Sequence, residues 1–111
     1  MNTVLNYTPG ATATIFLELK DGYGQRMDDG YIPVVQQIIL PTFTTATGYP
    51  QNMTELDIGL YYFQFTLPTG STAVGSYLVD VAYLSSAGYI NNDIFQIVCF
   101  AVSGNYGVTT F

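Results

Sequence analysis

The chain has 111 residues, of which 49% are hydrophobic and only 9% are charged. Disorder requires low hydrophobicity and high net charge, so this composition indicates a folded chain. The formal net charge is −6, and Lys20 and Arg26 are the only cations, too few for the basic patch that binds nucleic acid or an anionic membrane. The length suits one domain, and we expect a single domain over residues 1–111.

Membrane insertion, export and disulfide formation find no support in the sequence. No apolar run approaches the roughly 18 residues that a membrane-spanning helix needs. Residues Met1 to Val4 lack the basic segment and apolar core of a signal peptide, so export by that route is not expected. Cys99 is the only cysteine and cannot form a disulfide within the chain, and its apolar neighbours predict a buried thiol.

Short strands account for the pattern along the chain. Gly and Pro interrupt it at short intervals, and the segments between them are rich in Val, Ile, Thr, Tyr and Phe. Most of these segments alternate apolar and polar side chains, as strands with one buried face do. Pro33 indicates a strand that lies at an edge or enters its sheet late. In chain order, the predicted strands cover residues 3–7, 12–19, 31–40, 51–56, 61–67, 76–84 and 94–102, with an irregular stretch over 41–50 and no helix.

About seven short strands with frequent turns predict an all-β fold, an Ig-like β-sandwich of antiparallel strands. Two Gly-x-Tyr sequences, at Gly59–Tyr61 and Gly75–Tyr77, each stand at the start of an alternating segment. In a tyrosine corner, a Tyr at the end of a sandwich bonds to backbone upstream of it. We expect Gly59 and Tyr61 to form such a corner, with the Tyr61 side chain buried.

The order of these motifs resembles bacterial and phage Ig-like modules of the macroglobulin or invasin type. The front half agrees, through the Tyr7–Gly10 turn and the Leu19–Gly22 turn, and only residues 31–49 depart from the pattern. Small, acidic, cysteine-poor Ig-like proteins are most similar to phage virion components. The resemblance therefore implies a structural protein on the virion exterior, a capsid decoration (cement) protein. The alternative is a tail or fibre accessory domain that binds host-surface glycans.

No pattern of side chains points to catalysis or to a bound metal. The chain has no His, the usual general base and the commonest zinc ligand. The run from Asp21 to Gly30 is rich in oxygen ligands but lacks the spacing and the distal Glu of a calcium loop. A glycan-active enzyme would need two carboxylates facing one cleft, and the spacing of the acidic residues indicates none. We expect no enzyme activity, no cofactor and no metal.

Apolar side chains also occur on strand faces that should point to solvent. In the segment 94–102, Phe95, Ile97 and Cys99 form one apolar face, and the opposite face is apolar apart from Gln96. A loop or terminal strand of the same chain is one way to cover that face, and other subunits are the way we favour. The resemblance implies a homo-oligomer, commonly a trimer, bound to a major capsid or tail protein. The predicted contact residues are Phe16, Leu78, Ile94, Val98, Phe100, Val102, Tyr106 and Phe111.

Overall fold

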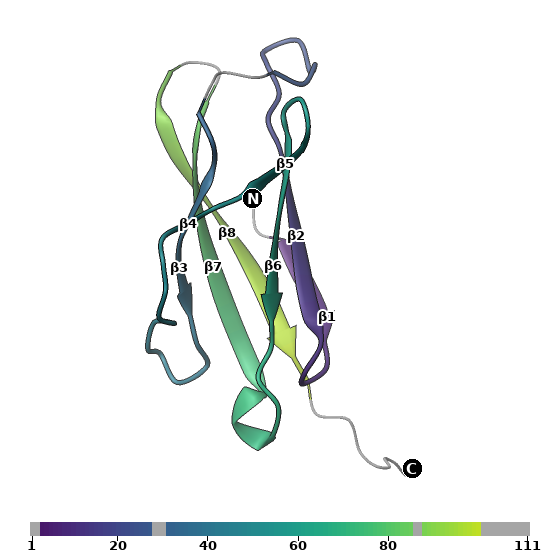
Figure 1. Ribbon diagram of the computed structural model, residues 1–111, viewed down its shortest axis with the longest axis vertical. Helices are drawn as coiled ribbons and strands as arrows, with labels where there is room; N and C mark the ends of the chain where they lie inside the picture. The colour runs from purple at the N-terminus through teal and green to yellow at the C-terminus, as the bar shows by residue number, and fades with distance from the viewer. Residues whose placement is uncertain (1–2, 28–30, 86–87, 101–111) are drawn as a thin grey trace.

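The chain is all-β and its strands form two facing sheets (Figure 1), as seen in a computed structural model that describes residues 3–27, 31–85 and 88–100. One sheet has five strands in the order β1-β8-β7-β3-β4, and the other has three in the order β2-β6-β5. The strands are β1 (Thr3–Tyr7), β2 (Thr12–Glu18), β3 (Val34–Ile39), β4 (Gln51–Asn52), β5 (Thr54–Asp57), β6 (Leu60–Thr66), β7 (Gly75–Leu84) and β8 (Ile90–Cys99). A single 3₁₀ turn, η1 (Ser71–Ala73), joins β6 to β7. The predicted all-β, two-layer fold is confirmed.

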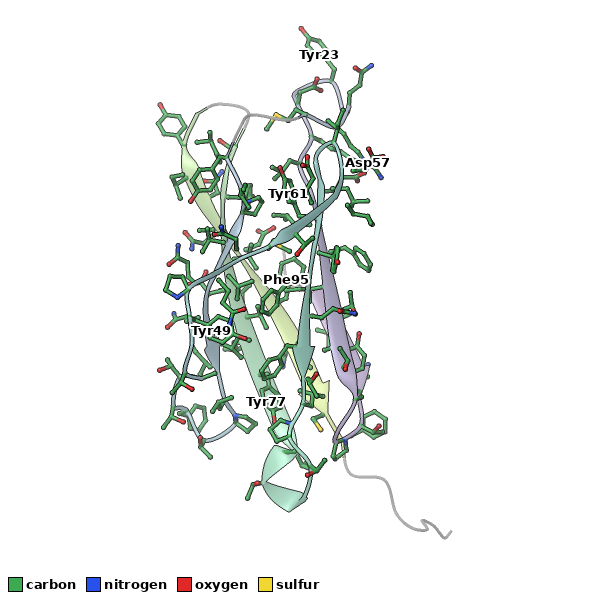
Figure 2. All side chains as sticks on the ribbon, viewed as in Figure 1. Tyr23, Tyr49, Asp57, Tyr61, Tyr77 and Phe95 are labelled. Atoms are coloured by element: carbon green, nitrogen blue, oxygen red, sulfur yellow. The ribbon has the colours of Figure 1, made fainter. Side chains whose placement is uncertain are left out.

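The inward side chains of both sheets make one apolar core. Alternate residues of each strand point to the same side of a sheet, so the apolar positions of β2, β6, β7 and β8 meet between the layers. Figure 2 shows Tyr61, Tyr77 and Phe95 lying in this space. No polar or charged residue is buried in the described part of the chain. The buried set includes Ala13, Ile15, Leu17, Val35, Ile38, Tyr61, Tyr77, Val79, Val81, Phe95, Ile97 and Cys99.

The strand β8 begins at Ile90, earlier than the predicted start at Ile94. The added residues pair with the end of β7 in an antiparallel hairpin, where Asn92 lies opposite Ala82 and Asp93 lies opposite Val81. Backbone hydrogen bonds hold such a ladder whatever the side chains are. Because the side chains on this part of β8 are mostly polar, the hydrophobic pattern of the sequence does not predict a strand there.

The strand β1 departs from the predicted antiparallel arrangement, because it pairs in parallel with β8. The short connection from Thr8 to Ala11 carries the chain from β1 in the five-stranded sheet to β2 in the other sheet. Because β1 and β2 lie in different sheets, they cannot form a hairpin with each other. β1 instead forms an edge of the five-stranded sheet beside β8 and runs in the same direction as β8.

The segment predicted as one strand over 51–56 divides between the two sheets. The strand β4 pairs with β3, and β5 pairs with β6. Met53 lies between them with its side chain buried, and its amide donates to the carbonyl oxygen of Pro33 at 2.9 Å. Pro33 precedes β3, so the predicted late entry into the sheet is confirmed. β3 itself lies between β7 and β4 and is not an edge strand.

Each Gly-x-Tyr sequence places its tyrosine in the core, two residues after a glycine that other residues approach too closely for a Cβ to fit. Gly59 has φ +72°, and a Cβ there would lie 2.8 Å from the carbonyl oxygen of Met27, so only glycine fits. The predicted burial of Tyr61 is confirmed. A hydrogen bond typical of a corner is present at Tyr77, whose hydroxyl donates to the carbonyl oxygen of Ala73 at 2.7 Å, and the corner at Gly59 and Tyr61 stays a prediction.

We expect Tyr77→Phe to lower the free energy of unfolding by about 1–3 kcal/mol, because it leaves the buried Ala73 carbonyl without its donor. Urea denaturation followed by circular dichroism measures the change. Tyr23→Phe is the control. The Tyr23 side chain is 93% exposed, so loss of its hydroxyl should not change the free energy of unfolding measurably. Equal unfolding midpoints for the Tyr77 variant and the wild type would contradict the role of this bond.

Candidate functional site

The predicted contact residues lie on two opposite faces of the sandwich. Leu78 on β7 and Ile94 and Val98 on β8 point outward from the five-stranded sheet and are partly exposed. Phe16 on β2 points outward from the three-stranded sheet and is 55% exposed. Phe100 is exposed just after β8. Val102, Tyr106 and Phe111 lie outside the described residues.

The first of these surfaces is the outer face of β7 and β8, formed by Ser76, Leu78, Asp80, Ile94, Gln96 and Val98, which we call the β7–β8 face. Its polar side chains bond to polar neighbours. The Gln96 amide donates to the Ser76 hydroxyl at 3.1 Å, and the Asp80 carboxylate accepts from Asn92 at 2.9 Å. These bonds leave Leu78, Ile94 and Val98 as an apolar surface that has no cation.

The second surface is a shallow groove of about 480 Å³ on the outer face of the three-stranded sheet. Two cross-strand pairs build it, Phe16 opposite Tyr62 and Thr14 opposite Gln64. Leu56 completes it from β5, where the pairing with β6 shifts register between Glu55 and Asp57. A bulge of this kind re-aims a side chain. The groove is lined by Thr14, Phe16, Leu56, Tyr62 and Gln64, and none of these is charged.

An ion cluster lies beyond the end of the groove and engages both cations of the chain. The Glu18 carboxylate accepts from Arg26 Nε at 2.6 Å and lies 3.3 Å from Lys20 Nζ. Arg26 also reaches Asp57, with 3.5 Å between Nη1 and Oδ2. The hydrogen bond from Arg26, and after it that from Lys20, lowers the pKa of Glu18 below its ordinary value. No cation is then left over to attract an anionic ligand.

A smaller hollow of about 250 Å³ opens at the end of the sandwich where β2, β7 and β8 meet. Burial, with a smaller effect of Asp93, raises the pKa of the Tyr83 hydroxyl there, so this hydroxyl is a poor base at neutral pH. Burial also raises the pKa of the Cys99 thiol, which the structure buries as the sequence predicts. Within residues 3–27, 31–85 and 88–100, no three His, Cys, Asp or Glu side chains come together to hold a metal.

Of the five residues that line the groove, sequence analysis singled out Phe16 alone as a contact residue and missed Thr14, Leu56, Tyr62 and Gln64. Leu56 lies in a polar segment without periodicity, on the same face of β5 as Thr54, which pairs with Tyr62. No helix in the described part of the chain is long and apolar enough to cross a membrane.

Comparisons of the chain with protein-family models, curated proteins and solved structures find no match.

The ion cluster predicts a pH-dependent contribution of Glu18 to stability. Since the pKa of Glu18 is lowered on folding, its charged form stabilises the fold above the ordinary value of 4.5, and this contribution is lost as the pH falls through the lowered pKa. We expect Glu18→Gln to lower the melting temperature slightly at pH 7, because the cluster is exposed. The difference from wild type should shrink as the pH falls through the lowered pKa of Glu18 and vanish once its carboxyl group is protonated.

Thermal melts between pH 7 and pH 2.5 measure this difference, with Glu55→Gln as the control. Glu55 is exposed on β5, and its substitution changes the net charge by the same amount. A melting-temperature deficit that is as large for Glu55→Gln as for Glu18→Gln would show that net charge, and not the cluster, is responsible.

Proposed function

We propose that this protein is a non-enzymatic structural component of a phage virion, a capsid decoration protein with an Ig-like fold. The observation that carries the proposal is the β7–β8 face, where Leu78, Ile94 and Val98 are partly exposed on a regular sheet surface. Each of the three lies opposite a polar residue of the neighbouring strand, and apolar side chains grouped at a surface in this way mark candidate sites of protein interaction. Decoration would bury this surface against neighbours and spread the contact over the shell.

The strand order supports the Ig-like part of the proposal. The order β2-β6-β5 corresponds to strands B, E and D of an Ig domain, and β8-β7-β3-β4 corresponds to G, F, C and C′. Tyr77 stands near the start of the strand that corresponds to F, and its hydroxyl returns to the backbone at Ala73. A tyrosine corner occupies this position in Ig-like sandwiches.

Charge supports the choice of the β7–β8 face as the contact between copies. Each copy has a net charge of −6, so two copies repel wherever carboxylates face each other. Lys20 and Arg26 are already paired with Glu18 and Asp57 of their own copy, so they offset little of this repulsion. The β7–β8 face carries one carboxylate, Asp80, which already accepts hydrogen bonds from Asn92 and Gln37. Two copies therefore meet there at low electrostatic cost.

The test is sedimentation of the purified protein, alone and with undecorated capsids. We expect the wild type to self-associate and to sediment with the capsids. Val98→Asp should abolish both, because it places an unpaired charge in an apolar contact. Phe16→Asp introduces the same charge on the opposite face and should leave both intact, and circular dichroism checks that each variant is folded. A wild-type monomer at all accessible concentrations that also ignores capsids would contradict the proposal.

A further inference from the structure

The groove on the three-stranded sheet is a second surface, on the opposite side of the sandwich from the β7–β8 face. Its apolar floor is more exposed than the β7–β8 face, since Phe16 is 55% and Leu56 is 59% exposed. Large apolar side chains grouped in a concave surface are typical of ligand sites. When a partner covers the β7–β8 face, this floor is still exposed to solvent.

The backbone beneath the groove is a regular antiparallel ladder. The strands β2 and β6 pair without a register shift from Thr12 opposite Thr66 to Glu18 opposite Leu60. The rings of Phe16 and Tyr62 are cross-strand neighbours in the middle of this ladder, so their spacing is set by the sheet. Little binding free energy is therefore lost to ordering of the backbone when a ligand binds here.

Hydroxyl and amide groups border the aromatic floor along the same two strands. The Gln64 amide donates to the Thr14 hydroxyl at 3.4 Å, and the hydroxyls of Thr12 and Thr66 lie 3.2 Å apart. Each of these groups has further capacity to donate or accept hydrogen bonds. An aromatic floor with a neutral polar border matches a pyranose ring, which has an apolar C–H face and a rim of hydroxyl groups.

The charge around the groove restricts the ligand further. None of the five lining residues is charged, and the nearby Arg26 is bonded to Glu18 and Asp57. The chain as a whole is acidic and repels anionic ligands. We therefore propose that this groove binds a neutral saccharide, with Phe16 and Tyr62 against its C–H face and Thr14 and Gln64 bonded to its hydroxyls.

The test is an NMR titration of the ¹⁵N-labelled full chain with neutral hexasaccharides of α-linked glucose, β-linked glucose, mannose and N-acetylglucosamine. We expect at least one to bind with a Kd of about 1 mM or tighter, shifting the amide signals of Phe16, Tyr62 and Gln64. A sulfated heparin hexasaccharide, the anionic comparison, should not bind. Phe16→Ala should weaken binding at least about tenfold, whereas Phe16→Tyr keeps the ring and should keep the affinity.

Leu78→Ala is the matched control, because it removes an apolar side chain from the opposite face and should leave saccharide affinity unchanged. Failure of all four neutral hexasaccharides to bind would overturn the proposal, as would full affinity in Phe16→Ala. Self-association that Phe16→Ala abolishes, without saccharide binding, would show that a second copy occupies the groove and would also overturn it. The sedimentation test is separate, because its disrupting variant, Val98→Asp, lies on the β7–β8 face, and its control, Phe16→Asp, is expected to leave association intact.

Discussion

The packing of apolar side chains between the two sheets is the interaction on which the other features depend. The described core buries no polar or charged residue, so burial of apolar area, at about 25 cal/mol per Å², supplies the main driving force. Such burial has no direction, and the position of one sheet over the other needs specific contacts. The rings of Phe65 on β6 and Tyr77 on β7 meet across the core with 5.8 Å between their centroids, and the Tyr7 hydroxyl on β1 accepts from the Thr14 amide on β2 at 3.2 Å.

Because the core is apolar, the charged residues that the structure describes lie at the surface, where they are unevenly distributed. Both cations gather on Glu18 at one end of β2. The two outer faces carry little charge, with Asp80 on the β7–β8 face and no charged residue lining the groove, but they differ in chemistry. The apolar side chains of the β7–β8 face are aliphatic, whereas the groove adds the aromatic rings of Phe16 and Tyr62. They lie on opposite sheets, so a shell contact on one and a saccharide on the other would not compete.

Hydrophobic alternation predicts β2, β6 and β7 well, since each has one face in the core and one in solvent. It fails where backbone pairing decides the outcome, as in the polar start of β8 at Asn91 and in the change of sheet at Met53. The sequence indicates that Phe16 and Leu78 point outward. It does not place them on opposite faces, because that depends on the order of strands in each sheet. Pairing between strands that are far apart in the sequence cannot be predicted from the local composition of either strand.

Cys99 occupies the inner side of β8, beneath the parallel pairing with β1, and its side chain is almost fully excluded from water. Thiol reagents attack the thiolate, which burial both shields and disfavours. A maleimide therefore reacts with Cys99 only while an opening of the core exposes this thiol. The reaction rate reports how often the core opens at the end of β8, with no substitution in the protein.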